Sequence, residues 1–171
     1  RYSDGRPASG HSYFTQQFIE ARNRAMRFGA TAVSTSGNSF NDVDGFDVTV
    51  AHGTNGWDAA ATFSPIPVGI TAGLSTTKDP VTEDVYVFIS NASVRKWTRT
   101  TAAWSTVSVG FPPVDCTESS IAFDSTRNRI LLLKGANSDC HHTFNPGDGT
   151  FTSQTLTGAG ASAINAASKA I

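Results

Sequence analysis

The residues best suited to chemistry are concentrated in the second half of the chain. Cys116 and Cys140 are the only two cysteines, and Cys140 is followed directly by His141 and His142. An aspartate precedes each cysteine, and thiolate, imidazole and carboxylate groups are all ligands of transition metals. A disulfide between Cys116 and Cys140, or two buried thiols, explains the same residues without a metal. We therefore treat Cys116 and Cys140 as a disulfide candidate and predict no metal site.

A second cluster of oxygen ligands lies in residues 41–47, NDVDGFD. Alternating carboxylates before a glycine can wrap a hard cation such as Ca²⁺. The segment lacks the downstream glutamate that completes an EF-hand loop. We interpret Phe46 and Asp47 as ordinary strand residues.

The usual catalytic signatures do not occur in this sequence. It has no Gly-x-Ser-x-Gly elbow, no phosphate-binding glycine loop and no His-Glu-x-x-His helix. We therefore predict no catalytic residues and no cofactor, and we favour a non-enzymatic function.

Composition limits the class of protein. The 171 residues suffice for one domain with a sizeable core, and 39% are apolar while only 16% are charged. Gly, Ser, Thr, Asn and Asp are abundant, which favours many short strands joined by turns. A net charge of −1 excludes bulk nucleic-acid binding, and no apolar run approaches the roughly 20 residues of a membrane span. The opening RYSDGRPASG is typical of the interior of a longer protein or of a processed form.

The elements that would position these residues are short strands in three units. The expected strands are 11–18, 25–28, 43–50 and 57–63; then 68–77, 84–89, 93–99 and 103–108; then 116–123, 129–134, 141–145 and 150–155. A turn at 21–24 joins the first two, although residues 20–27 also fit one or two helical turns. Trp57, Trp104 and Phe151 are each 47 residues apart, and Asp79 and Asp124 are 45 apart. The spacing varies in the loops while the strands keep register, which indicates a repeated supersecondary unit.

Four strands in about 47 residues is the period of a β-propeller blade. We predict an all-β fold of four-stranded antiparallel blades, with units at 10–63, 68–108 and 116–155. Residues 160–171 are the start of a further blade or a tail, for which a short helix is the alternative. Three blades leave apolar faces uncovered, so we expect the chain to be part of a larger ring. The aromatic residues of the fourth strands are expected to pack between blades.

The pattern of a strand, an aspartate turn, an apolar strand and a closing aromatic resembles kelch repeats and galactose-oxidase-like propellers. The residues that carry it run from Asp79 to Trp104, from Asp124 to Phe151 and, more loosely, from Arg22 to Trp57. Gly29-Ala30, Ile89-Ser90 and Lys134-Gly135 stand where kelch repeats have two glycines. The resemblance implies a toroid of about six to eight blades. The copper site of the oxidases has no counterpart here, so that activity does not carry over.

In propeller topology the loops between second and third strands share one face with the entries into the first strands. On this face we place the candidate ligand-binding residues His11, Asn41, Asp42, Asn91, Asp139, His141 and His142. We expect a binding or structural module that presents these loops to a protein or glycan partner, outside the cell or in a virus particle. Further blades of the same propeller are the other expected partner. The alternative is a fragment of a carbohydrate-active or oxidase-type propeller enzyme whose active site lies largely outside this chain.

Overall fold

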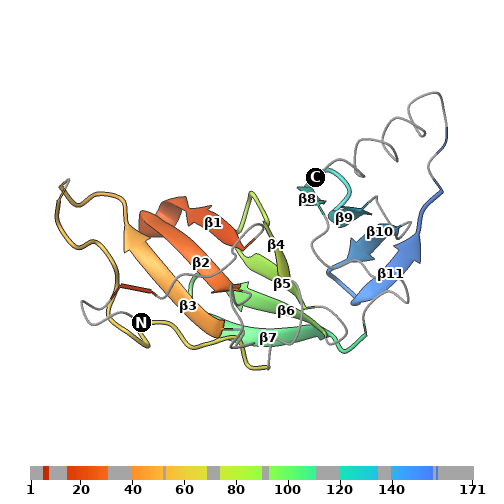
Figure 1. The fold of residues 1–171 in the computed structure, drawn as a ribbon. Helices are drawn as coiled ribbons and strands as arrows, with labels where there is room; N and C mark the ends of the chain where they lie inside the picture. The colour runs from red at the N-terminus through yellow and green to blue at the C-terminus, as the bar shows by residue number, and fades with distance from the viewer. Residues whose placement is uncertain are drawn as a thin grey trace.

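The computed structural model describes residues 6–7, 15–30, 40–51, 53–68, 74–89, 93–110, 120–134, 140–155 and 157. Within these residues the fold is all-β, with three antiparallel sheets and one short 3₁₀ turn but no α-helix. The strands fall inside the three predicted units, and the tail at 160–171 lies outside the described residues. Figure 1 shows the three sheets following one another along the chain.

The second and third sheets have the predicted strands. The second contains β4 (Leu74–Lys78), β5 (Val85–Ile89), β6 (Ser93–Thr98) and β7 (Ala103–Ser108), hydrogen-bonded in that order. The third contains β8 (Ser120–Asp124), β9 (Arg129–Lys134), β10 (Cys140–Asn145) and β11 (Thr150–Ser153) in the equivalent order. Both sheets are therefore simple antiparallel meanders.

An aspartate organises the turn between the first two strands of each of these sheets. Asp79 Oδ1 accepts a hydrogen bond from the backbone N–H of Val81 at 2.8 Å. Asp124 Oδ1 accepts the N–H groups of Thr126 and Arg127, at 3.1 and 3.2 Å. Such Asx turns let a short side chain replace a backbone partner, so the repeated aspartate predicts the repeated hairpin.

The first sheet has three strands, β1 (Gln16–Ile19), β2 (Arg24–Ala30) and β3 (Phe40–Asp47). The predicted hairpin is present, and its turn is the 3₁₀ turn η1 (Glu20–Arg22), closed by Asn23 in the left-handed region at φ 51°. β3 begins and ends three residues earlier than predicted, because the side chain of Asp47 accepts the backbone N–H of Thr49 and turns the chain.

The predicted fourth strand of this sheet, at 57–63, is wrong. Only Trp57 forms a bridge, to Phe46, and no regular strand follows it. The chain turns at residues 59–62, where Thr62 N–H bonds to Ala59 O at 3.2 Å. Phe63 and Ile66 then enter the core between the first two sheets, with exposures of 7% and 0%. The free energy gained by burying these two side chains therefore outweighs that of continued strand pairing.

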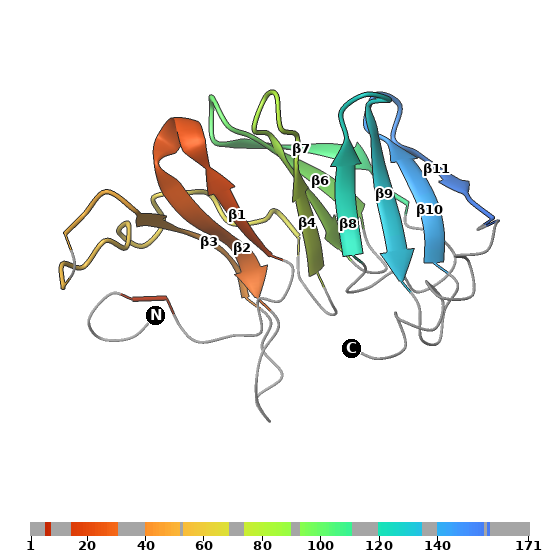
Figure 2. The same ribbon diagram turned by 90° about the horizontal axis from the view of Figure 1, so that it is seen from above.

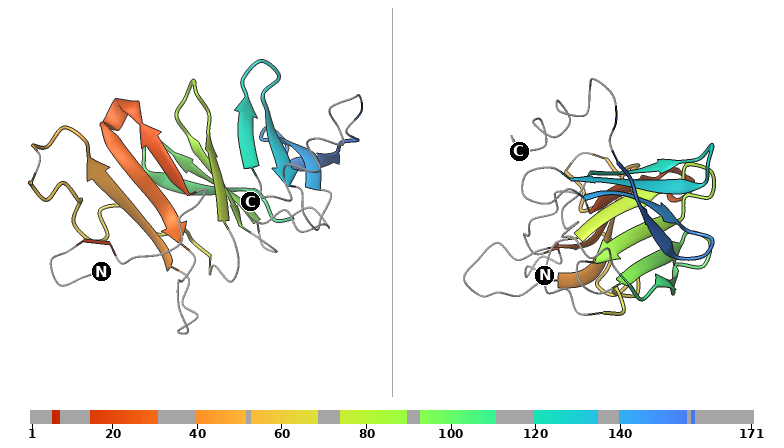
Figure 3. Two further views of the ribbon diagram at one scale, coloured as in Figure 1. Left: turned by 45° about the horizontal axis from the view of Figure 1, so that its top comes forward. Right: turned by 90° about the vertical axis from the view of Figure 1, so that its right-hand side faces the viewer.

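The inner strand β5 of the second sheet is buried on both faces. All five residues of β5 are buried, and successive side chains point to opposite faces. Val85, Val87 and Ile89 join a core with the first sheet, whereas Tyr86 and Phe88 join a second core with the third sheet. The sheets are therefore stacked face to face, as Figure 3 shows.

The two interfaces use equivalent aromatic contacts. Phe28 of β2 lies 5.4 Å from Trp97 and 6.2 Å from Trp104, centroid to centroid. Phe88 of β5 lies 5.4 Å from Phe144 and 6.3 Å from Phe151, also in edge-to-face geometry. The prediction that the closing aromatics pack between units is thus correct for Trp104 and Phe151.

Polar contacts also join the first two sheets. The carboxylate of Glu83 accepts the backbone N–H groups of Glu20 and Ala21, at 2.6 and 3.0 Å. The guanidinium of Arg22 donates to Arg99 O at 2.9 Å and lies 5.4 Å from the Trp97 ring. Arg22 is therefore a packing residue between sheets rather than a solvated turn residue.

The first strands of the three sheets are neighbours: β1 contacts β4, and β4 contacts β8. Between β1 and β4 the side-chain amide of Gln17 donates to Thr76 O at 3.1 Å. The turns that join β1 to β2, β4 to β5 and β8 to β9 lie along the upper edge of Figure 2. The stack therefore presents equivalent turns on a single edge.

Candidate functional site

We call the edge with these three turns the turn edge and the opposite one the loop edge. On the loop edge each second strand ends and each third strand begins: Ile89 pairs with Ser93, and Lys134 pairs with Cys140. Every candidate ligand-binding residue was expected on this edge. No helix among the described residues is long and apolar enough to cross a membrane.

Asn41 and Asp42 lie at the start of β3 on the loop edge, inside a strand rather than in a loop. The side-chain amide of Asn41 donates to Ile66 O at 3.0 Å, and Ile66 N–H donates to Asn41 O at 2.8 Å. Asn41 therefore anchors the segment that replaces the fourth strand. Asp42 is exposed, so its carboxylate is accessible to a partner.

The acidic residues that follow in β3 are held by arginines. Asp44 is 1% exposed and lies 2.6 Å from Arg27 Nη2, and Asp47 lies 2.8 Å from Arg24 Nη1. The two carboxylates are three residues apart and so lie on opposite faces of the strand. This arrangement agrees with the interpretation of the segment as a strand.

His141 and His142 follow Cys140, the first residue of β10, at the loop edge, and each is 7% exposed. His142 pairs with Leu132 and faces the second sheet, whereas His141 pairs with Leu133 on the outward face. Burial lowers the pKa of His142, and the neighbouring His141 lowers it further. Within the described residues His142 Nδ1 has no hydrogen-bond partner. Because the two imidazoles lie on opposite faces, they cannot chelate the same ion.

The remaining predicted residues are not tested by the structure. His11, Asn91, Cys116 and Asp139 lie outside the described residues, and only the backbone of Cys140 is described. The disulfide between Cys116 and Cys140 therefore stays a prediction. Among the described residues no three His, Cys, Asp or Glu side chains are grouped to hold a metal ion.

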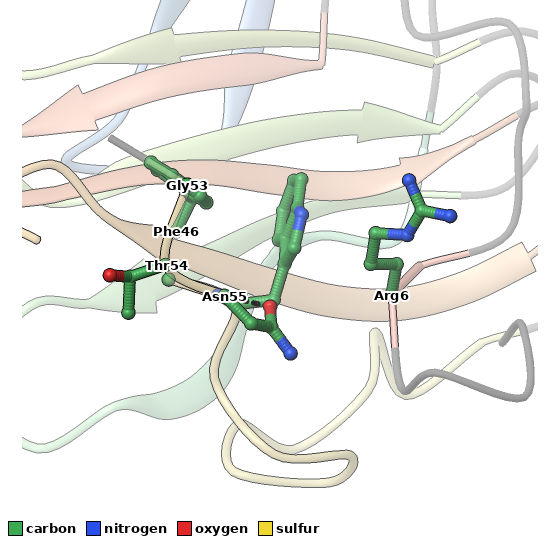
Figure 4. Close-up of a pocket in the computed structure, with 7 residues that line it drawn as sticks. Arg6, Phe46, Gly53, Thr54 and Asn55 are labelled. Carbon is green, nitrogen blue, oxygen red and sulfur yellow. Dashed lines mark hydrogen bonds between the residues drawn. The ribbon is translucent and has the colours of Figure 1, made fainter. Parts of the chain in front are cut away.

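A hollow of about 440 Å³ lies on the outward face of the first sheet (Figure 4). Phe46 and Trp57 form part of its lining, with ring centroids 5.3 Å apart at 70°. Arg6 borders one side, and Gly53 and Thr54 border the other. This hollow was not predicted from the sequence, although Trp57, the first member of the aromatic repeat, marked its position.

The loop that lines this hollow requires a glycine at position 56 for its close packing. A Cβ atom at this position would lie 2.7 Å from the Val50 side chain, 2.9 Å from Phe46 and 3.0 Å from Asp47 O. The close approach holds Trp57 against β3, where Asn55 Oδ1 also accepts the Trp57 N–H at 3.2 Å. The aromatic pair is thus positioned by tight backbone packing.

A second hollow, of about 310 Å³, lies where the first sheet meets the turn after β6. Its lining includes Arg22, Arg24 and Asp58. Arg24 Nε lies 3.1 Å from Asp58 Oδ2, and the guanidinium of Arg22 bonds to Arg99 O. These contacts engage both guanidinium groups, so the hollow is not arranged to capture an anion.

Two comparisons with known proteins found no match. No family model matches the chain, and no curated protein matches it. Any statement about function therefore depends on the geometry above.

Proposed function

We propose that the chain is part of a β-propeller and acts as a non-catalytic binding or structural module. Its loop edge would meet a protein or glycan partner. The observation that carries the proposal is the stacking of three sheets through equivalent faces, with their first strands side by side. Adjacent first strands and radially stacked meanders are the arrangement of propeller blades.

The distribution of polar contacts favours a scaffold with binding loops. The charged residues of the turn edge are used within the fold, since Lys96 pairs with Asp84 at 2.7 Å and Arg127 with Asp124 at 2.8 Å. On the loop edge, by contrast, Asp42 near the start of β3 is exposed. Segments carried on a rigid scaffold commonly bind partners.

The kelch-like assignment within this proposal is supported by the residue pattern. The turn aspartates and closing aromatics occupy equivalent places in the second and third sheets. An adhesion or assembly role would place such a module outside the cell or in a virus particle.

A printed glycan array tests the proposed function. We expect binding by the unmodified protein and its reduction at least tenfold by Asp42→Ala. Val81→Ala is the matched control, because Val81 is 81% exposed on the turn edge. Loss of binding with Val81→Ala but not with Asp42→Ala would contradict the loop-edge assignment. Absence of binding across the array would contradict the glycan-binding form of the proposal.

A further inference from the structure

Each sheet carries one row of side chains that runs across its strands, which we call the closing row. In the second sheet Val85 pairs with Trp97, which pairs with Trp104, and in the third sheet Ile130, Phe144 and Phe151 pair in the same way. In the first sheet Phe18 pairs with Ala25, Ala25 with Phe46, and Phe46 bridges Trp57. Paired residues share a face of a sheet, so each row is a continuous surface.

Two of the three closing rows are buried against the preceding sheet. Val85, Trp97, Ile130 and Phe144 are each 0% exposed. Phe28 of the first sheet packs against the closing row of the second sheet, and Phe88 of the second sheet packs against that of the third. Both make the edge-to-face contacts given above. A closing row is therefore one half of an interface, and the receiving side chain on the neighbouring sheet is the other half.

The closing row of the first sheet has no such partner among the described residues. Phe18 is 42% exposed, Ala25 is exposed, and Phe46 and Trp57 are only half-buried around the 440 Å³ hollow. Large apolar side chains grouped on one face in this way mark an interaction surface.

The matching receiving face, at the other end of the stack, is partly exposed: His141 on this face is buried, but its neighbours are accessible. Phe88 pairs with Val94, and Leu133 pairs with His141 at the equivalent place in the third sheet. Leu133 is 38% exposed, Leu131 is half-buried and Ala122 is exposed, all on the face turned away from the second sheet. Leu133 is therefore the third-sheet counterpart of the receiving residues Phe28 and Phe88.

We infer that these two surfaces bind each other between two copies of this chain. The closing row of one copy covers Leu133 of the other, continuing the type of interface that already joins the sheets within the chain. The inference rests on the proposed propeller arrangement. Because the surfaces differ, the contact is head-to-tail, and such contacts either close into a ring or extend as a filament.

The described residues of one copy form three sheets, so two copies of this 171-residue chain supply six. Propellers typically contain about 4–8 blades, and six is the only multiple of three in that range. Two copies would thus close one ring with two interfaces. Each interface would bury the closing row of one copy against the receiving face of the other. A net charge of −1 on each copy opposes the association only weakly.

Sedimentation equilibrium of the 171-residue chain tests the inference. The chain has a mass of 18.0 kDa, so the closed pair has twice that mass, about 36 kDa. Leu133→Glu and Phe18→Glu should each shift the protein to 18.0 kDa, because a carboxylate would be buried without a partner. Val81→Glu should keep the wild-type mass, since Val81 lies on the turn edge. Circular dichroism should show that all three variants fold, because the substituted side chains are exposed.

Mixing the two disrupted variants gives a sharper readout. The Leu133→Glu protein keeps an intact closing row, and the Phe18→Glu protein keeps an intact receiving face. The mixture should therefore form a 1:1 pair of about 36 kDa with one interface, although neither variant pairs alone. A symmetric contact between identical surfaces would not be rescued in this way.

A wild-type mass of 18.0 kDa at roughly 100 µM, where micromolar association is nearly complete, would overturn the inference. Species larger than the pair would overturn the closed ring. A monomer that still binds glycans through Asp42 would leave the proposed function standing. A pair that binds none would contradict the glycan-binding proposal alone.

Discussion

Trp97 is the residue at which the packing of the first two sheets converges. Its side chain is 0% exposed, and its ring lies 5.4 Å from Phe28 and 6.1 Å from Phe63. The guanidinium of Arg22 lies 5.4 Å from the same ring. One side chain thus contacts β2, the 3₁₀ turn and the segment that replaces a fourth strand.

Trp97→Ala should lower the free energy of unfolding by about 3–5 kcal/mol, because it leaves a large cavity. Trp97→Phe should cost less, since it keeps a ring and removes an indole N–H that has no partner within the described residues. Urea denaturation measures both, with the exposed Val81→Ala as control. Equal losses for the alanine and phenylalanine variants would contradict the cavity explanation.

The lowered pKa of His142 predicts that the stability of the protein depends on pH. Burial lowers its pKa in the folded protein below the ordinary value of 6.5, so the unfolded chain binds a proton more readily. The stabilisation that depends on neutral His142 is therefore fully present above pH 6.5, and it is lost as the pH falls through the lowered pKa. The wild type should lose stability over this range, and His142→Gln should reduce the slope. A slope that is unchanged in His142→Gln would assign the effect to other groups.

At the scale of elements, the turn at 146–149 shows how neighbouring sheets constrain each other's loops. Gly149 has a φ of 73°, and a Cβ atom there would lie 2.3 Å from Val107 O of β7. A glycine is required both by the backbone conformation and by the adjacent strand. The turn of the third sheet is thus fitted to the second sheet.

Gly149→Ala should destabilise the protein by about 1–3 kcal/mol, since it adds backbone strain and a clash with a carbonyl oxygen. Gly147→Ala in the same turn is the control, because its Cβ would meet only the Asn145 side chain, at 3.3 Å. Thermal unfolding of both variants measures the difference. Similar midpoints for the two would show that β7 yields to the added methyl group.

At the scale of the whole molecule, the second sheet packs against both of the other sheets. Among the residues that the structure describes, only this sheet contributes to both cores, and all residues of β5 are buried. The outer sheets each pack on one face within the described residues. The free energy of local opening should therefore be highest at β5 and lower toward the first and third sheets.

Amide hydrogen exchange should show the slowest exchange in β5, with faster exchange in β1 and β11. The reason is that β5 opens only when both cores are disrupted. Phe88→Ala should accelerate exchange in the third sheet more than in the first, because Phe88 belongs to the second core. Slower exchange in β9 than in β5 would contradict this order of stability.

Much of the second and third sheets could be predicted from the sequence. Asp79 and Asp124 specify their own turns through local hydrogen bonds, and the apolar residues after them form central strands. The fourth strand at 57–63 was predicted wrongly, because Phe63 and Ile66 pack into a core that no local pattern reveals. The order of strands also placed Asn41, Asp42, His141 and His142 on one edge, but their contacts could not be predicted.

The sequence by itself determined the all-β class, the three units and the repeated aromatic positions, because turn chemistry and strand alternation are local properties. Only the tertiary structure decided which polar residues bind within the fold, such as Arg22, Asp44 and Glu83. It also decided that Trp57 borders an open hollow while Trp104 and Phe151 are packed against a neighbouring sheet. The same residue type acts differently at equivalent positions because burial depends on what lies across the interface.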